Sequence, residues 1–339
     1  MKILVIQTAS IGDVILATPV PEGLHDAYPS AEIDLLIKNG MEGLFKEHPF
    51  INRLIVWDKS IKYREFLRIL IEVRKRKYDL IVNVQRFALT GVLTGFSGAS
   101  TTIGFSKNPF SFLFTRRIPH RVAKSIHEVE RNISLISSMI TAGQRAKEFG
   151  SAPRPRLYPS SSDEARVIPY KSKPYVTISP ASLWFTKQYP AGKWVELIQS
   201  LPPALHIYLL GSPADLPLCE EISSSSGKKN LLILAGSLSF LESAALMKDA
   251  QMNYTNDSAP MHLASAVNAP TSVVYCSTVP EFGFGPLSGK HWIIQSRKEL
   301  RCRPCGLHGK KECPLHHFEC ATTISVDQFP TIPGEIQKL

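Results

Sequence analysis

Predominantly apolar runs alternate along this chain with stretches in which apolar residues recur at helical spacing. Such short runs are typical of strands buried on both faces of a parallel sheet. These runs predict strands at 3–6, 32–38, 54–57, 80–84, 175–179, 206–210, 231–234, 252–255 and 271–275. We expect the strand at 271–275 to be the last one. Helical spacing between these strands predicts helices at 63–77, 127–139, 194–201, 218–223, 240–249 and 260–267. The repeated strand–helix order indicates an α/β protein with two doubly wound halves.

A segment rich in proline, serine and charge, residues 143–173, separates the two halves and shows no sustained periodicity. Such composition is typical of the connection between domains. We predict an N-terminal domain over residues 1–155, a linker over 156–173 and a C-terminal domain over 174–339.

The first strand is followed by small residues that allow a ligand to approach the backbone, namely Thr8, Ala9, Ser10 and Gly12. Asp13 comes next, beyond the carboxyl end of the strand, where open α/β sheets bind their ligands. Two roles are open to this carboxylate, a helix cap or a functional group. Thr18 and Pro19 are suited to the N-cap and first position of a helix, which would leave Asp13 in a loop.

In the second half, the strand at 175–179 runs into a loop that holds Ser182, Thr186 and Lys187. A lysine beside two hydroxyls is suitable chemistry for a diphosphate, although a solitary loop lysine is commonly only solvated.

A second anchor follows the strand at 252–255. Asp257 or Ser258 is suited to cap the next helix, and Pro260 fits its first turn. The free amides of such a turn bind phosphate without a metal. His262 lies where it would reach the same ligand, with packing or a surface role as the alternative.

The chain is basic, with 39 Lys and Arg against 29 Asp and Glu in 339 residues, a net charge of +10. This excess suggests an acidic partner: nucleic acid, an anionic membrane surface or a phosphorylated substrate. Polar residues interrupt the N-terminal segment, so no secretory signal is expected. No run of about 18 apolar residues occurs, and we expect a cytoplasmic protein that does not span a membrane.

The segment 105–124 interleaves aromatic and cationic side chains: Phe105, Phe110, Phe112 and Phe114 with Lys107, Arg116, Arg117, Arg121 and Lys124. Such interleaving is typical of a surface that contacts anionic lipid or anionic sugar. The alternative is a loop whose phenylalanines pack into the core.

Four cysteines near the C-terminus, Cys302, Cys305, Cys313 and Cys320, form the pattern C-x2-C-x7-C-x6-C. The first pair has the spacing of zinc ligands, but the other spacings do not match a common zinc finger. A structural zinc site and a reduced, packed segment therefore both stay open. The glycine motifs of dehydrogenases and P-loop NTPases are absent, and so is a D-x-D motif for a divalent metal.

Four ordered motifs resemble glycosyltransferase family 9, the bacterial lipopolysaccharide heptosyltransferases. They are GDVILATP (12–19), SPASLWFTKQYP (179–190), NDSAPMHLASA (256–266) and STVPEFGFGP (277–286). The resemblance extends to HPFINRLIVW (48–57), YDLIVNVQ (78–85), TIGF (102–105) and HEVERN (127–132), and so covers nearly the whole chain. The cysteine segment makes the chain most similar to the heptosyltransferase II branch.

The resemblance implies a GT-B fold, in which two Rossmann-like domains face a central cleft. It implies that Asp13 is the general base and that Lys187, with Ser182 and Thr186, meets the donor diphosphate. The donor site would be lined by Asp257, Ser258, Ala259 and His262. From their places in the pattern, we expect Ser10, Gly12, Gln85, Arg116, Arg117 and Arg121 on the acceptor side. The chain departs from the family pattern at Ala181 and Ala259, usually Gly, and at Gln7 and Asn83, commonly a basic residue and Asp.

The function expected from the resemblance is inverting transfer of a heptose from ADP-heptose to the inner core of lipopolysaccharide. No metal cofactor is expected. The expected partners are the nucleotide-sugar donor, an anionic lipid-linked saccharide acceptor and the cytoplasmic leaflet of the inner membrane, to which the protein would bind peripherally. No nucleic acid is expected. The alternatives are a family 9 transferase that uses another nucleotide sugar and a non-catalytic nucleotide-binding protein.

Overall fold

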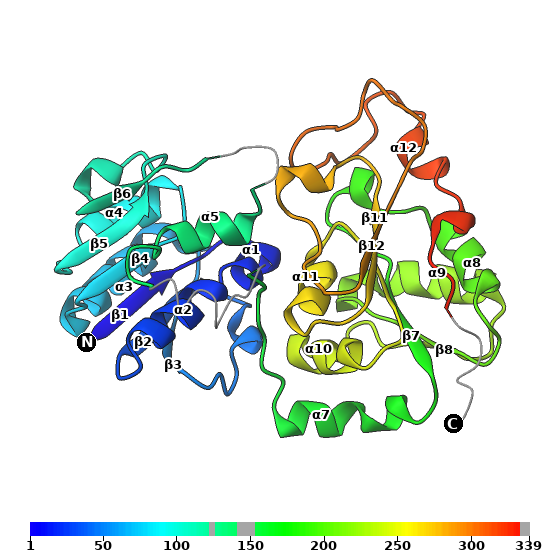
Figure 1. The fold of residues 1–339 in the computed structure, drawn as a ribbon, viewed down its shortest axis with the longest axis horizontal. Coiled ribbons are helices and arrows are strands. Elements are labelled where there is room, and N and C mark those ends of the chain that lie inside the picture. Colours follow the sequence, from blue (N-terminus) through cyan, green and yellow to red (C-terminus); the bar gives the residue numbers. More distant parts are fainter. Residues whose placement is uncertain (122–125, 141–152, 333–339) are drawn as a thin grey trace. The chain divides into compact units, whose positions relative to one another are not determined.

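The computed structural model describes residues 1–121, 126–140 and 153–332, which form two compact units, Met1–Tyr158 and Pro159–Leu339. Each unit contains a six-stranded parallel sheet with helices on its faces (Figure 1). The predicted α/β class with two doubly wound halves is confirmed. Within the described residues, no helix combines the length and the apolar character needed to cross a bilayer.

The stretch predicted as a linker contains regular structure. Helix α7 (Ser161–Val167) begins at a capping box in which the Ser160 hydroxyl donates to Asp163, 2.7 Å away. This helix packs against α10 (Phe240–Lys248) of the C-terminal unit. Residues 143–152 of the predicted connection lie outside the described part of the chain.

The sheet of the N-terminal unit has the strand order β3-β2-β1-β4-β5-β6. Its strands are β1 (Lys2–Ile6), β2 (Glu32–Lys38), β3 (Ile51–Trp57), β4 (Leu80–Asn83), β5 (Thr101–Phe105) and β6 (Arg116–Ile118). Its helices are α1 (Ile11–Leu16), α2 (Pro19–Ala27), α3 (Lys62–Arg76), α4 (Ala88–Gly95) and α5 (Glu128–Ser134). The order reverses between β1 and β4, so the loops after these strands stand at the switch point where such sheets bind ligands.

The expectation that Asp13 lies in a loop was wrong. Helix α2 does begin at Pro19, but the shorter α1 precedes it, and Asp13 is the third residue of α1. Ser10 and Asp13 form a capping box that starts α1. Thr18 has helical backbone angles, and its hydroxyl donates to the carbonyl of Ile15 at 2.8 Å instead of capping α2.

The helix predicted at 127–139 ends earlier, at Ser134, and continues as turns. The serine hydroxyls of this region bond to nearby backbone: Ser134 donates to the carbonyl of Arg131 at 2.6 Å, and Ser137 to that of Ser134 at 3.0 Å. Such bonds compete with the helical hydrogen-bond ladder, which explains the early end.

The sheet of the C-terminal unit has the order β12-β11-β10-β7-β8-β9. Its strands are β7 (Tyr175–Ser179), β8 (His206–Leu209), β9 (Leu231–Ile233), β10 (Asn253–Asn256), β11 (Thr271–Tyr275) and β12 (His291–Gln295), and its other helices are α8 (Ala191–Ser200), α9 (Leu216–Ser226), α11 (Ala259–Ala266) and α12 (Glu319–Thr322). Strand β12 follows the strand that we expected to be last. It is an edge strand whose first three residues are exposed, so it lacks the buried apolar run on which the prediction relied.

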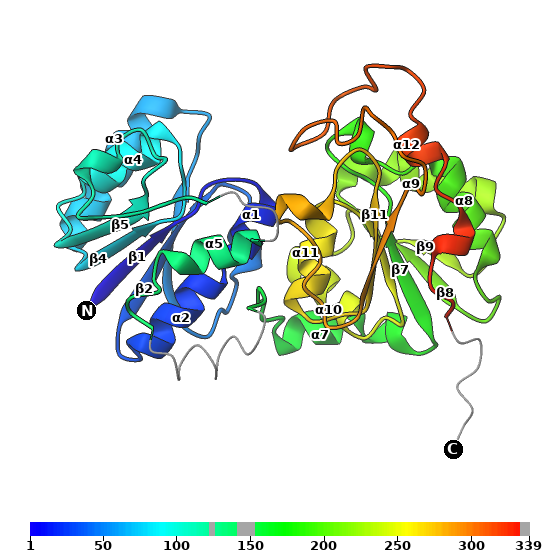
Figure 2. The same ribbon diagram turned by 45° about the horizontal axis from the view of Figure 1, so that its top comes forward.

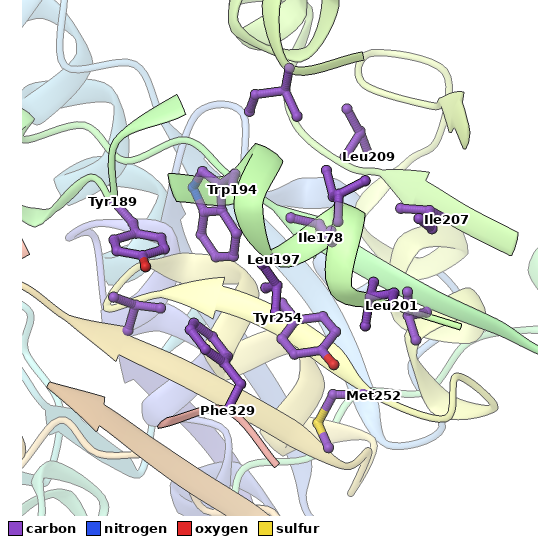
Figure 3. Close-up of a cluster of buried hydrophobic side chains, with 14 of the residues drawn as sticks. Ile178, Tyr189, Trp194, Leu197, Leu201, Ile207, Leu209, Met252, Tyr254 and Phe329 are labelled. Carbon is purple, nitrogen blue, oxygen red and sulfur yellow. The ribbon is translucent and has the colours of Figure 1, made fainter. Parts of the chain in front are cut away.

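The core of the C-terminal unit anchors the loop that follows β7. Tyr189 and Trp194 are fully buried and meet edge to face, with ring centroids 5.1 Å apart, in the cluster that also contains Ile178 and Tyr254 (Figure 3). The Tyr189 hydroxyl donates to the carbonyl of Ile324 at 3.1 Å. Because Tyr189 stands two residues after Lys187, this packing fixes the end of the loop that carries Lys187.

Candidate active site

Lys187 and Asp257 form an ion pair at the carboxyl edge of the C-terminal sheet. Lys187 lies on a short 3₁₀ turn after β7, and Asp257 directly follows β10. The Lys187 Nζ lies 2.7 Å from Asp257 Oδ2, and these side chains are only 15% and 9% exposed. Thr278, which follows β11, donates its hydroxyl to the same carboxylate oxygen at 2.6 Å. Three strand ends thus supply one cation, one carboxylate and one hydroxyl at a single point.

Asn256 ties together the two ends of the loop that carries Lys187. Its side-chain amide donates to the carbonyl of Pro180 at 2.7 Å, and its amide oxygen accepts from the backbone of Tyr189 at 2.9 Å. Ser182 lies within this loop, half-buried, and its backbone donates to Gln188 Oε1 at 3.2 Å. The Ser182 hydroxyl has no protein partner in the part of the chain that the structure describes, so it is available to a ligand.

Thr186, by contrast, uses its hydroxyl within the protein. The Oγ1 atom accepts from the backbone of Lys310 at 2.7 Å and from the hydroxyl of Ser277 at 3.0 Å. The Thr186 side chain is buried. Thr186 therefore joins three segments of the chain, and its predicted role at the donor diphosphate stays a prediction.

The first turn of α11 follows the Asp257 position. Ser258 has the extended backbone of an N-cap residue, and Pro260 lies in the first turn, as the sequence predicts. Ser258 and Ala259 are half-buried, whereas His262 lies further along the helix and is buried. The backbone amides of this first turn therefore begin at the residue next to the Lys187–Asp257 pair.

The cysteine segment lies along the loop that follows β11. The Arg303 guanidinium donates to the carbonyls of Cys276 and Thr278, both at 2.7 Å. The backbone of Cys305 donates to the carbonyl of Ser277 at 2.8 Å. Burial lowers the pKa of Arg303 from its ordinary value. Arg303 thus holds in place the loop that carries Thr278.

The thiols of this segment are not joined in disulfides. No cysteine forms a disulfide, and the Cys302 sulfur lies 3.8 Å from His317 Nε2. Burial and then the neighbouring thiol Cys305 raise the pKa of Cys320 to about 12. Among the described residues, no group of three or more His, Cys, Asp or Glu has an arrangement that would hold a metal ion. The zinc site stays a prediction.

Gly309 of the cysteine segment packs against the stem of Lys187. Its φ is +77°, and an added Cβ would lie 2.8 Å from Lys187 Cγ and 3.1 Å from Thr186 Oγ1. We expect Gly309→Ala to displace the Lys187 side chain and to lower kcat/KM for the nucleotide-sugar donor that the resemblance implies by roughly 10–100-fold, because small misplacements of reacting groups are costly. Steady-state kinetics with varied donor measures this effect.

Gly306 provides the matched control. It also has a positive φ, +92°, but an added Cβ would meet nothing within 4 Å. Gly306→Ala therefore carries similar backbone strain without the contact, and its kcat/KM should stay within about twofold of the unmodified protein. Equal losses in the two variants would show that strain alone, and not the position of Lys187, explains the effect.

In the N-terminal unit, Asp13 lies half-buried on the first turn of α1. Its Oδ2 atom accepts from the hydroxyl of the exposed Ser10 at 2.6 Å and from the backbone of Ser10 at 3.3 Å. The other carboxylate oxygen has no protein hydrogen-bond partner within the described residues. Asp13 therefore caps the helix with one oxygen and leaves the second for a ligand, with Gly12 beside it.

Gln85 forms hydrogen bonds with the loop that precedes Asp13. It is buried, and with its amide oriented to satisfy its neighbours, it accepts from the backbones of Thr8 and Ala9 at 3.1 and 2.8 Å. Lys59, which follows β3, donates from Nζ to the carbonyl of Thr8 at 2.6 Å. Burial, and then Lys38, lower the pKa of Lys59. Gln85, predicted on the acceptor side, thus holds the loop before Asp13.

Cations collect where β4, β5 and β6 end. Burial, and then the nearby charges of Arg86, Arg131 and Lys107, lower the pKa of His120 to about 4. Arg131 is paired with Glu128 at 2.6 Å. Arg86 lies three residues after the end of β4 and Lys107 two residues after the end of β5, and the charges of both act on His120.

The arginines predicted on the acceptor side lie on β6, an edge strand of the N-terminal sheet, and shortly after it. Arg116 and Arg117 are exposed on β6, and Arg121 is exposed shortly after it. Successive strand residues point to opposite faces, so Arg116 and Arg117 cannot face the same ligand. Of the interleaved phenylalanines, Phe105 and Phe114 are buried and Phe112 is exposed. Lys124 lies outside the described residues.

The comparison with known families covers most of the chain. Residues 66–316 match the sequence model of glycosyltransferase family 9 (heptosyltransferase). The chain belongs to this family. It is therefore a glycosyltransferase of the heptosyltransferase family.

Individual relatives agree with this assignment. The chain is 29% identical to lipopolysaccharide heptosyltransferase 3 of Escherichia coli, with 79% of this chain and 81% of that protein covered. It superposes on E. coli ADP-heptose lps heptosyltransferase II with a TM-score of 0.75 and 22% identity, over 97% and 96% of the two chains. For E. coli heptosyltransferase WaaC with ADP-2-deoxy-2-fluoro heptose, the TM-score is 0.68 at 19% identity, over 87% and 93%.

These structural similarities confirm the predicted GT-B class of fold. The curated relatives of this family 9 chain include heptosyltransferases 1, 2 and 3, at 25%, 24% and 29% identity, so they do not resolve its branch.

Within this family 9 chain, the structure brings together Lys187 and Asp257, which the sequence had assigned to separate loops. Thr278 was contained in a quoted motif but not assigned a role. Arg303, Gly309 and Lys59 were missed, because their contacts join segments that are distant in the sequence and no local pattern marks them.

Proposed function

We propose that this chain catalyses inverting transfer of a heptose from ADP-heptose to a sugar hydroxyl of the lipopolysaccharide inner core. The observation that carries the proposal is the Lys187–Asp257–Thr278 arrangement beside the first turn of α11, in a member of a heptosyltransferase family. The solved WaaC complex with a fluorinated ADP-heptose supports the choice of donor. The cysteine segment favours the heptosyltransferase II branch.

On the donor side, Lys187 would turn from Asp257 to the diphosphate as the nucleotide sugar binds. The amides of Ser258 and Ala259 and the Ser182 hydroxyl would donate to the remaining phosphate oxygens. His262 would line the same site. Negative charge develops on ADP as the glycosidic bond breaks, and a cation placed in advance lowers the energy of that transition state.

On the acceptor side, Asp13 would act as the general base. The acceptor hydroxyl attacks the anomeric carbon, its proton passes to the carboxylate oxygen that Ser10 leaves unbonded, and ADP departs with the electron pair of the broken bond. Attack opposite to the leaving group inverts the anomeric configuration.

The acceptor in this proposal is an anionic, lipid-linked saccharide. Arg86, Lys107 and Arg121, with Arg116 or Arg117, would meet its phosphates or carboxylates near the Asp13 loop. The protein would accordingly be a cytoplasmic one that binds peripherally at the inner membrane, and its net charge of +10 would serve this contact and not nucleic acid.

The function is tested by offering the purified protein a set of nucleotide sugars with an inner-core acceptor and measuring nucleoside diphosphate release and product mass. We expect ADP-heptose to be used in clear preference to ADP-glucose, UDP-glucose and GDP-mannose. Preference for another donor would make the chain a family 9 transferase of different specificity. Tight ADP binding without any transfer would make it a non-catalytic nucleotide-binding protein.

We also expect turnover without a divalent metal, because Lys187 and backbone amides would meet the charge of the leaving ADP. Activity in EDTA should stay within about twofold of the activity of the untreated protein. Removal of a metal ion that stabilises the transition state would lower activity much more than this. Loss of activity in EDTA, restored by magnesium or manganese, would contradict this expectation.

A further inference from the structure

Exposed apolar side chains are concentrated on one part of the N-terminal unit. Of the seventeen large hydrophobic side chains exposed among the described residues, eight lie between residues 61 and 112. They are Ile61, Tyr63, Leu67, Ile71, Phe87, Leu89, Phe96 and Phe112, which together we name the α3–α4 face. Scattered apolar residues on a surface are ordinary, whereas a concentration of this kind marks an interaction site.

These residues belong to one layer of the structure. Helices α3 and α4 lie side by side on the same face of the sheet (Figure 2), and Leu93 of α4 shares a buried cluster with Ile69 and Val73 of α3. Arg74 of α3 donates to the carbonyl of Phe96, the C-cap residue of α4, at 2.8 Å. The turn that carries Phe112 packs on α4, where a Cβ added at Gly95 would lie 2.6 Å from Leu113.

Helix α3 carries a second apolar stripe that the fold does not bury. Ile69 and Val73 face the core and are buried, while Tyr63, Leu67 and Ile71 are 82%, 56% and 52% exposed. The latter three are spaced four residues apart, so they form a continuous row of about 12 Å along the helix. A surface helix ordinarily presents polar residues on that side.

The charge around the α3–α4 face is positive. Residues 63–77 contain six Lys or Arg and two Glu. Both glutamates, Glu65 and Glu72, are already paired with Arg68, at 2.8 and 3.0 Å. Arg64 and Lys75 are exposed, and α4 contains no charged residue. A second copy of the chain on this face would bring like charges together, whereas an anionic surface would complement them.

We propose that the α3–α4 face docks on an anionic lipid bilayer. This inference rests on the proposed function, since a lipid-linked acceptor requires the enzyme at a membrane. The row of apolar side chains enters the headgroup region, and the flanking cations attract the surface. In this proposal the apolar contact with the bilayer lies mainly on α3 and α4. The segment 105–124 contributes only Phe112 to this face.

The position of the α3–α4 face suits delivery of the acceptor. Tyr63 and Phe87 stand at the beginnings of α3 and α4, next to the ends of β3 and β4. The ends of these strands also carry Lys59 and Arg86, which belong to the edge of the sheet where the Asp13 loop lies. A saccharide that projects from the bilayer would therefore reach this edge.

The test is co-sedimentation of the full-length protein with vesicles of phosphatidylcholine alone or mixed with phosphatidylglycerol. The unmodified protein should prefer the anionic vesicles, and Leu67→Gln/Ile71→Gln should bind them at least about tenfold more weakly, since two apolar side chains are lost from the contact. The matched control is Ile168→Gln/Leu232→Gln, which replaces side chains that are 63% and 46% exposed on the C-terminal unit. The control should bind as the unmodified protein does.

Three results would overturn the proposal: no vesicle binding by the unmodified protein, equal binding by Leu67→Gln/Ile71→Gln, or a dimer in sedimentation that this variant abolishes. Transfer from ADP-heptose to a deacylated, soluble acceptor is measured in parallel and should be unchanged in both variants. Absence of that transfer in the unmodified protein would refute the proposed function, whereas vesicle binding reports on the surface alone.

Discussion

Asp13→Asn is expected to lower kcat by about 10²–10⁴-fold, the range that a positioned general base contributes. The asparagine amide keeps the size of the side chain and can still accept from Ser10, but it cannot take the proton of the acceptor hydroxyl. ADP affinity should be little changed, because the nucleotide is assigned to the other unit. Single-turnover kinetics with saturating donor and acceptor, together with ADP titration, measures both quantities.

Asp215→Asn is the matched control for the capping role of Asp13. Asp215 is also half-buried and occupies the same position of a capping box, with its Oδ2 accepting from the Ser212 hydroxyl at 2.8 Å, against 2.6 Å between Asp13 and Ser10. Both substitutions should cost a similar share of the roughly 0.5–2 kcal/mol that such caps contribute to the free energy of unfolding. Near-normal turnover of a folded Asp13→Asn protein would reduce Asp13 to a helix cap.

Lys187→Met is the second substitution with a large expected effect, a fall in kcat/KM for the donor of about 10²–10³-fold. The substitution removes the cation assigned to the departing diphosphate. It also leaves the carboxylate of Asp257, only 9% exposed, without its ion-pair partner. Removing one partner of a buried ion pair destabilises the folded state by roughly 3–5 kcal/mol, so part of this loss should appear as a lower Tm.

Stability and catalysis are separated by two further variants. Lys187→Met/Asp257→Asn removes both charges, so Tm should recover while activity stays low. Lys171→Met removes a lysine of similar exposure in the same unit, since Lys171 is 17% exposed and lies 2.8 Å from Glu164 and 2.6 Å from Asp249, which are themselves 33% and 51% exposed. It should lower Tm without lowering donor kcat/KM. An equal loss of activity in Lys171→Met would show that stability, and not phosphate binding, explains the effect of Lys187.

Most strands that are buried on both faces were predictable from the sequence, although the buried strand β5 was not predicted. Strands β1, β2 and β7 are of this kind, and the expected ranges nearly coincide with the observed ones. Strands β6 and β12 lie at sheet edges and have exposed side chains. Their sequences therefore lack the buried apolar run on which the strand predictions relied. Helix α1 was missed because it is only six residues long and the stronger Thr18–Pro19 signal follows it.

The candidate site was predictable to the extent that it lies at strand ends. Asp13, Lys187 and Asp257 all follow buried strands, and the rule for open α/β sheets therefore nominates them. The sequence does not reveal that the Thr186 hydroxyl is hydrogen-bonded to Lys310 and Ser277, because these partners lie about a hundred residues away along the chain. The same distance hides the contact of Gly309 with the Lys187 stem.

The cysteine segment supports the site through atoms other than its thiols. Its thiol spacing suggested a metal, yet the contacts that matter for the site come from its backbone and from Arg303, which hold the loops of Thr186 and Thr278. These contacts make the segment part of the support of the loops that carry Lys187 and Thr278, whether or not its thiols bind an ion.

The central claim, inverting heptosyl transfer, is tested most directly by the structure of the product. The purified protein is incubated with ADP-heptose and an inner-core acceptor, and the new glycosidic bond is examined by NMR. The account predicts a transferred heptose whose anomeric configuration is opposite to that in the donor. A product with retained configuration, or ADP-heptose recovered intact beside unmodified acceptor, would contradict it.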